Sequence, residues 1–191
     1  MTEPPGRRER KKAATRQKIA DTALRLFLEH GYDAVGIRDV AAESDVAVTT
    51  VFSHFASKEA LVFERDQDFE QRLTRAVTDR PPHQPLIPAL HREVQALVRH
   101  CTAEDSAPVR RMIEASPALQ KYEESMSLRH AQALATALAT DPHLTRSTTA
   151  CQATARFTID AYTLARQADD PQATTDEIFR MIKAAWEATT P

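Results

Sequence analysis

Residues 36–55 read GIRDVAAESDVAVTTVFSHF, and this stretch decides the fold of the N-terminal part of the chain. Its apolar side chains recur at helical spacing in two short runs, which are Ile37, Val40 and Ala41, then Val51 and Phe55. Ala41 is small enough for two helices to cross closely at a steep angle, as they do in a helix-turn-helix. The pattern therefore predicts two short helices, near residues 37–44 and 48–55, joined by a tight turn.

The turn between these helices and the outer face of the second helix fit a DNA-reading unit. Asp45 occupies the tightest position of the turn, and aspartate adopts left-handed backbone more readily than most residues. Val46 can fill the space beneath the turn. With the apolar side chains inward, the second helix presents Val48, Thr49 and Ser53 outward, and a helix of this width fits the major groove. The spacing alone also fits two small packed helices that bind nothing.

The charge of the 191-residue chain is distributed unevenly, although its formal net charge is only -2. Residues 1–20 contain seven basic and two acidic side chains, a net charge of +5, whereas residues 1–64 contain ten of each. The basic side chains of this arm are Arg7, Arg8, Arg10, Lys11, Lys12, Arg16 and Lys18. Overall charge gives no argument for nucleic-acid binding, and the arm fits either phosphate binding or a solvated charged segment.

The whole chain has the pattern of an all-α protein with about nine helices. Apolar residues recur at helical spacing almost throughout, and only three glycines occur. The expected helices span about 9–30, 37–44, 48–55, 57–79, 90–101, 105–115, 116–141, 144–168 and 174–188. Gly31 is expected to stop the first helix, and Thr174 with Glu177 to form a capping box for the last. Four prolines, Pro81, Pro82, Pro85 and Pro88, predict a boundary between an N-terminal head and a C-terminal body.

Neither catalysis nor a bound cofactor or metal is expected from this sequence. The three glycines cannot form a phosphate-binding loop, and no HExxH or paired-cysteine site occurs. Cys101 and Cys151 lie in amphipathic stretches and are expected to be reduced core residues. No apolar stretch follows the basic N-terminus, and the composition is too polar for a span of about 20 apolar residues, so a cytoplasmic protein without membrane contact is expected.

From residue 17 to residue 61 the sequence resembles the TetR family of regulators. The matching residues are Gln17-Lys18-Ile19, Ala23, Leu26-Phe27, Gly31-Tyr32, Ile37-Arg38-Asp39-Val40-Ala41, Val46, Thr50-Val51-Phe52, His54-Phe55 and Ser57-Lys58-Glu59-Ala60-Leu61. The ending around Ser57-Lys58-Glu59 is the most specific, because many helix-turn-helix families share the preceding pattern. The resemblance implies a DNA-binding domain with its basic arm at residues 1–57, and a ligand-binding and dimerisation domain at 58–191.

The resemblance also implies roles for eight side chains of the head. Four of them are expected to hold phosphates (Thr50, Phe52, His54 and Lys58), and four to face base edges or the groove (Arg38, Val48, Thr49 and Ser53). Lys58 begins a helix, so its ammonium lies beside exposed amides that also favour phosphate. Three positions depart from the family pattern, because Phe52, Ala47 and Gly36 replace polar residues. Phe52 is therefore expected to serve mostly in packing, and the basic arm to supply part of the affinity.

Members of this family typically enclose an effector among the middle helices and dimerise through the last two. The resemblance implies a pocket formed by Leu97, Arg111, Met112, Tyr122, Met126, His130 and Phe157, and a dimer interface that includes Ile178, Ile182 and Ala185. Each pocket residue has the alternative of a plain core residue, which such side chains form more often. The implied function is a repressor that binds a palindromic operator in double-stranded DNA as a homodimer and is released by a small lipophilic or acyl-type effector, such as an acyl-coenzyme A. The alternative is a regulator without a small-molecule ligand, or with an activating role.

Overall fold

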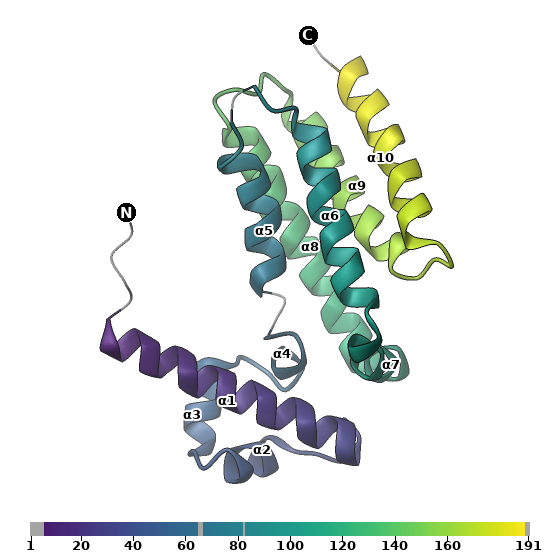
Figure 1. Cartoon of the computed structure of the whole chain (residues 1–191). Coiled ribbons are helices and arrows are strands. Elements are labelled where there is room, and N and C mark those ends of the chain that lie inside the picture. Colours follow the sequence, from purple (N-terminus) through teal and green to yellow (C-terminus); the bar gives the residue numbers. More distant parts are fainter. Residues whose placement is uncertain (1–5, 65–66, 82, 190–191) are drawn as a thin grey trace. The chain divides into compact units, whose positions relative to one another are not determined.

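The computed structural model describes residues 6–64, 67–81 and 83–189, and within them it is built of helices without strands (Figure 1). The helices are α1 (Arg7–His30), α2 (Ile37–Glu43), α3 (Val48–His54), α4 (Glu59–Val62), α5 (Gln67–Thr78), α6 (Leu86–Thr102), the short 3-10 helix η2 (Glu104–Ser106), α7 (Ala107–Ala115), α8 (Pro117–Thr140), α9 (Thr148–Ala165) and α10 (Pro171–Ala188). The all-α prediction is confirmed.

The chain forms two compact units. The first contains Met1–Arg65 and Pro108–Gln120, and the second contains Asp66–Ala107 and Lys121–Pro191. These two units are defined by the contacts within them. The predicted boundary between a DNA-binding domain ending at residue 57 and a ligand-binding domain beginning at residue 58 is a functional one, and it stays a prediction.

Helix α1 packs against α2 and α4 in the first unit. Its apolar residues return about every helical turn and bury one face, which consists of Ile19, Ala20, Ala23, Leu26 and Phe27. The helix ends where expected, because Gly31 has a φ of 89° and its N–H donates to the Phe27 carbonyl at 3.0 Å. A positive φ costs glycine little, since it has no Cβ. The predicted stop at Gly31 is confirmed.

The segment after Ser57 differs from the single long helix that was expected. Ser57 does accept from the Ala60 N–H, at 3.4 Å, but α4 ends at Val62 and α5 begins only at Gln67. Phe63 leaves helical geometry, with φ -98° and ψ 22°, while its ring stays buried. Val62, Phe69 and Leu73 keep helical spacing across the break, so the spacing alone did not reveal it.

The core of the second unit is an apolar interior shared by α5, α6, α8, α9 and α10. Figure 1 shows these helices side by side, with α10 beside α6 and α9. The expectation that the proline-rich segment separates two domains is wrong, because Leu73 and Val77 before it belong to the same core as Leu86 and Leu90 after it. Its described prolines belong to the α5–α6 turn and the first turn of α6, where a missing N–H costs no helical hydrogen bond. Pro82 lies outside the described residues.

The last helix begins earlier than the predicted capping box. Asp170 is its N-cap, and its carboxylate accepts from the Ala173 N–H at 2.9 Å. Pro171 follows in the first turn, where its fixed φ suits a helix and its missing N–H costs nothing. The capping box at Thr174 and Glu177 is therefore wrong, because Asp170 and Pro171 start the helix one turn earlier.

Candidate nucleic-acid interface

Helices α2 and α3 are held together by the turn that the sequence predicted. Asp45 has a φ of 54°, the left-handed conformation expected at this position. The Val46 N–H donates to the Ala41 carbonyl at 3.0 Å, so the turn closes directly onto the end of α2. Ala41 is 2% exposed, and its small side chain leaves room for the two helices to cross closely. These contacts define a helix-turn-helix.

Helix α3 has one buried and one exposed face. Val51 is completely buried and Phe55, just after the helix, is 2% exposed. Thr49, Phe52 and Ser53 are exposed, whereas Val48, Thr50 and His54 are half-buried beside them. The Ser53 hydroxyl donates to the Thr50 carbonyl at 2.7 Å. The outward residues thus form a continuous surface that a nucleic-acid groove could accept.

Phe52 corrects the expectation that this position serves mainly in packing. Its side chain is 54% exposed, although it is a large apolar ring. The two other departures behave as expected, because Ala47 caps α3 without a side-chain hydrogen bond and Gly36 does the same for α2. At Gly36 the backbone N–H donates to the Asp39 carboxylate at 2.7 Å instead. Arg38 is exposed on the first turn of α2.

Arg16 fixes the C-terminal end of α3, and nothing in the sequence pattern singled it out for this role. Its guanidinium forms a two-pronged ion pair with Glu64 and also donates to the His54 carbonyl. It lies over the Phe55 ring, 4.2 Å from the centroid. Such a fork matches a carboxylate in plane and direction. Arg16 is thus a positioning residue that joins α1 to the end of the exposed helix.

Lys58 is placed at the start of α4, but its ammonium folds back onto the first unit. It donates to the Tyr32 carbonyl and lies 4.1 Å from the centroid of the Tyr32 ring. Burial lowers its pKa, and the nearby carboxylates of Asp33, Glu59 and Asp39 offset this only in part. The side chain is half-buried, so it combines a structural contact with a charge near the surface.

From Arg7 onward, the basic arm forms the start of α1. The side chains of residues 6–14 are all exposed, so the first two turns of α1 extend without packing against the unit. Arg7, Arg8, Arg10, Lys11 and Lys12 form no ion pair with a carboxylate of the described residues. Because these first turns bury nothing and their cations form no ion pair with the described carboxylates, the segment is well suited to a polyanion.

The residues predicted to line an effector pocket are spread over different environments. Leu97 and Met126 are buried in the second unit, and Tyr122 and His130 are half-buried there. Arg111 and Met112 belong to α7 in the first unit, where Arg111 is exposed. Phe157 is 51% exposed on α9, so it does not point into the core. The effector pocket at these residues stays a prediction.

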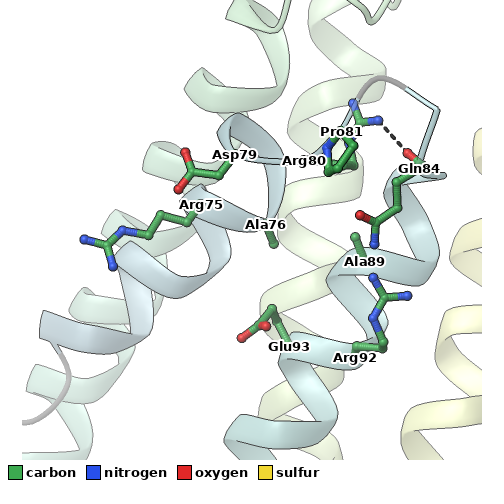
Figure 2. A pocket seen from close by; sticks show the side chains of 9 residues that line it. All are labelled: Arg75, Ala76, Asp79, Arg80, Pro81, Gln84, Ala89, Arg92 and Glu93. Atoms are coloured by element: carbon green, nitrogen blue, oxygen red, sulfur yellow. Dashed lines mark hydrogen bonds between the residues drawn. The ribbon is translucent and has the colours of Figure 1, made fainter. Parts of the chain in front are cut away.

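Figure 2 shows a different hollow, of about 180 Å³, between α5, α6 and their connection. Charged side chains dominate it, namely Arg75, Asp79, Arg80, Arg92 and Glu93. The side chain of Arg80 is almost fully buried and pairs with Asp141 at 2.8 Å, while it donates to the Gln84 carbonyl at 2.6 Å. None of the predicted effector residues lines this hollow, and its polar walls differ from those of a typical ligand pocket.

His130 has an unusual environment for a titratable side chain. Its ring stacks on Phe69 with 4.9 Å between centroids. Burial, with a smaller contribution from Arg129, lowers its pKa to about 4. At neutral pH the imidazole is therefore uncharged.

This depressed pKa leads to a prediction for stability. Between pH 6.5 and 4 the unfolded chain binds a proton at His130 that the folded chain does not, so the free energy of unfolding falls as the pH is lowered. Urea denaturation at pH 7.5 and 5.0 should show a larger loss for the wild type than for His130→Gln. Equal losses in the two proteins would contradict the assignment.

The three predicted dimer-interface residues lie on α10 but differ in exposure. Ile182 is 3% exposed and belongs to the core of the second unit, whereas Ile178 is half-buried and Ala185 is exposed. Ile182 therefore contacts its own chain, because Phe179 and Trp186 on the same face are buried with it. Exposed apolar side chains occur instead at Phe157 and Leu164 on α9 and at Met181 on α10.

Within the described part of the chain, no cluster of three or more His, Cys, Asp or Glu side chains could hold a metal ion. Cys151 is buried as expected, while Cys101 is only half-buried, and neither cysteine forms a disulfide. None of the described helices combines the length and apolar character needed to cross a membrane.

Comparison with known proteins identifies the class to which this helix-turn-helix belongs. Residues 19–64 match the family model described as bacterial regulatory proteins, tetR family. The HTH-type transcriptional repressor Rv3405c of Mycobacterium tuberculosis (strain ATCC 25618 / H37Rv) is 31% identical over 143 residues, which are 73% of this chain and 75% of the repressor. The chain belongs to the tetR family, and it is a DNA-binding transcriptional regulator.

Two further similarities define how far this assignment reaches. The HTH-type transcriptional regulator TcmR of Streptomyces glaucescens is 35% identical over 77 residues, which are 40% of this chain but only 34% of TcmR. The solved structure of the TetR family repressor AlkX from Dietzia sp. strain DQ12-45-1b has a TM-score of 0.63 and 18% identity, covering 91% of this chain and 98% of AlkX. These proteins are regulators and not enzymes, so the chain is assigned to a family of regulators.

Proposed function

We propose that this chain represses transcription as a dimer that binds a palindromic operator and is released by a small lipophilic or acyl-type effector. The observation that carries the DNA-binding part is the exposed surface of Thr49, Phe52 and Ser53, on a helix anchored by Val51 and Phe55. Thr50, His54 and Lys58 border this surface and are the proposed phosphate contacts, while Arg38 and Val48 reach toward the groove with Thr49 and Ser53.

The experiment that tests DNA binding is an electrophoretic mobility shift with the promoter region beside the chain's own gene. Random DNA of the same length is the control, because phosphate contacts alone bind both fragments equally. A much tighter complex with the promoter supports the proposal. Equal binding to both fragments, or none, would count against a specific operator at that promoter.

Lys58→Ala is expected to weaken binding to operator and random DNA by similar factors. It removes a charge but no base contact. The slope of log affinity against log salt should therefore fall by the amount that one phosphate contact contributes. Thr49→Ala and Arg38→Ala should instead change the preference among operator variants, if these side chains read bases. Because Lys58 also bonds Tyr32, the variant's thermal melt is needed as a control. Unchanged affinity and slope would rule out the phosphate role.

The proposed dimer forms through an exposed apolar stripe on α9 and α10. Phe157 and Leu164 are seven residues apart and therefore lie on one face of α9. Met181 and Ala185 are four residues apart on α10, with Ile178 beside them. Met181 is 66% exposed, so its apolar side chain lies in water in the single chain. A second copy that covers it would remove this apolar surface from water. A dimer would also place two reading helices on the two halves of a palindrome.

The proposed effector is a small lipophilic or acyl-type molecule. The relative Rv3405c is named a repressor, and AlkX is a repressor implicated in biodegradation of n-alkanes. If effector binding lowers operator affinity a hundredfold, the coupling free energy between the effector site and the DNA-binding site is about 2.7 kcal/mol. This value is within the usual range for linked sites. Operator binding should therefore be titrated with fatty acyl-coenzyme A thioesters and fatty acids. Compounds that bind without changing operator affinity are not inducers, and a regulator that responds to none favours a ligand-independent role.

A further inference from the structure

The second unit contains an ion pair in its interior that the sequence did not reveal. Arg166, at the end of α9, donates to the Glu123 carboxylate of α8 at 2.6 Å. The side chains are 10% and 24% exposed, so the cation is more deeply buried than its partner. The Nε of Arg166 is buried and has no hydrogen-bond partner among the described residues. A buried guanidinium thus keeps one donor unused.

A row of rings leads away from this cation. The Arg166 guanidinium lies 5.8 Å from the centroid of the Tyr162 ring, and Tyr162 meets Phe69 edge-on at 4.7 Å. Phe69 in turn stacks on His130, and the flexible, buried Met126 lies one helical turn before His130. The row therefore joins a cation at one end to apolar side chains at the other. A molecule with an anionic head and an apolar tail matches this row, because its head can pair with the cation and its tail can contact the apolar side chains.

Two other basic side chains, His130 and Arg111, are less suitable than Arg166 for binding an anionic head. His130 is uncharged at neutral pH, because burial lowers its pKa to about 4. Arg111 is exposed on α7 and belongs to the first unit. Burial alone would lower the pKa of Arg166, but the Glu123 carboxylate outweighs this and raises it, so the guanidinium stays charged. Arg166 is the cation available inside the second unit along this row.

We infer that Arg166 is the anion-binding group of the effector site, and that the effector is a lipophilic carboxylate which replaces Glu123. This inference rests on the proposed function and names the effector class for it. The incoming carboxylate accepts from the guanidinium, including its unused Nε–H, while its tail lies along Tyr162, Phe69 and Met126. Exchange of one carboxylate for another never leaves the buried cation unpaired, which would be costly.

The same exchange supplies a reason for a structural response. In the free chain the pair ties α8 to α9, because Glu123 and Arg166 come from different helices. A carboxylate that takes the place of Glu123 breaks this tie and must separate the packed rings between α5, α8 and α9. Glu123 is the more exposed partner, so its release to solvent is the easier half of the exchange.

The test compares two ligands of equal chain length on the full-length protein. Decanoate carries the anionic head and 1-decanol a neutral one, and their affinities are measured by calorimetry for the wild type, Arg166→Met and Glu123→Gln. The wild type should prefer decanoate by about tenfold or more, as expected for a charge-assisted hydrogen bond. Arg166→Met should remove the preference, and Glu123→Gln should strengthen decanoate binding by removing its competitor. Arg72→Met is the control for loss of an ion-paired arginine, because Arg72 pairs with Glu93 in the same unit and not with Glu123.

The outcomes separate this inference from the proposed function. A role in stability alone would lower the melting temperature of both Arg166→Met and Glu123→Gln without changing the preference for decanoate, and this result would overturn the inference. So would wild-type protein that binds neither ligand, or Glu123→Gln that binds decanoate no better. The gel shift with promoter DNA tests the regulator separately: if it fails while decanoate binding depends on Arg166, the anion site stands and the proposed repressor does not.

Discussion

Neutralising the basic arm is expected to weaken binding to operator and to random DNA by roughly a hundredfold or more at low salt. The five alanine substitutions are made together at Arg7, Arg8, Arg10, Lys11 and Lys12, whose side chains are exposed. Each phosphate contact contributes about 0.9 to the slope of log affinity against log salt, so loss of three or four contacts should lower the slope by about 3. Because residues 6–14 bury nothing, folding should be unaffected.

The control for the arm removes the same charge elsewhere. Arg75, Arg92, Arg99, Lys121 and Arg180 are exposed basic residues of the second unit, and their replacement by alanine changes the net charge equally. Fluorescence anisotropy between 50 and 300 mM salt then compares the two variants. If both lose the same affinity and slope, the arm acts only through overall charge, and direct contact with DNA is excluded.

Met181→Glu together with Leu164→Glu is expected to convert the proposed dimer to a monomer and to weaken operator binding at least a hundredfold. Each substitution places a charge in an interface that would otherwise exclude water, at a cost of roughly several kcal/mol. A monomer then holds only one half of the palindrome. Both positions are exposed in the single chain, at 66% and 54%, so the variant should fold. Sedimentation velocity measures the assembly, and anisotropy measures operator affinity.

Two other substitutions make the dimer test specific. Lys183→Glu lies two residues beyond Met181, which is about 200° around the helix, so it should leave the dimer intact. Ile182→Asp instead buries a charge in the core of the second unit and should unfold it, since Ile182 is 3% exposed. A double variant at Met181 and Leu164 that remains a dimer with unchanged operator affinity would show that the interface lies elsewhere.

The helix-turn-helix could be located from the sequence because its signals are local. The spacing of Val40, Ala41 and Val51 marks the buried faces, and Asp45 and Gly31 take the positive φ values expected of them. The outward position of Thr49 and Ser53 then follows from helical geometry alone. The same reasoning failed after Ser57, where one apolar stripe continued across two separate helices.

The sequence by itself determined the all-helical fold, the helix-turn-helix and the tetR-family resemblance, because helical periodicity and turn residues act over a few positions. Only the tertiary structure decided which distant side chains meet. Arg16 pairs with Glu64, 48 residues away, and Arg166 pairs with Glu123, 43 residues away, and no periodicity links such pairs. Packing likewise turned Ile182 into the core and left Met181 exposed, although both are apolar neighbours on one helix. Periodicity gives the faces of a helix, but the neighbouring helices determine which face is buried.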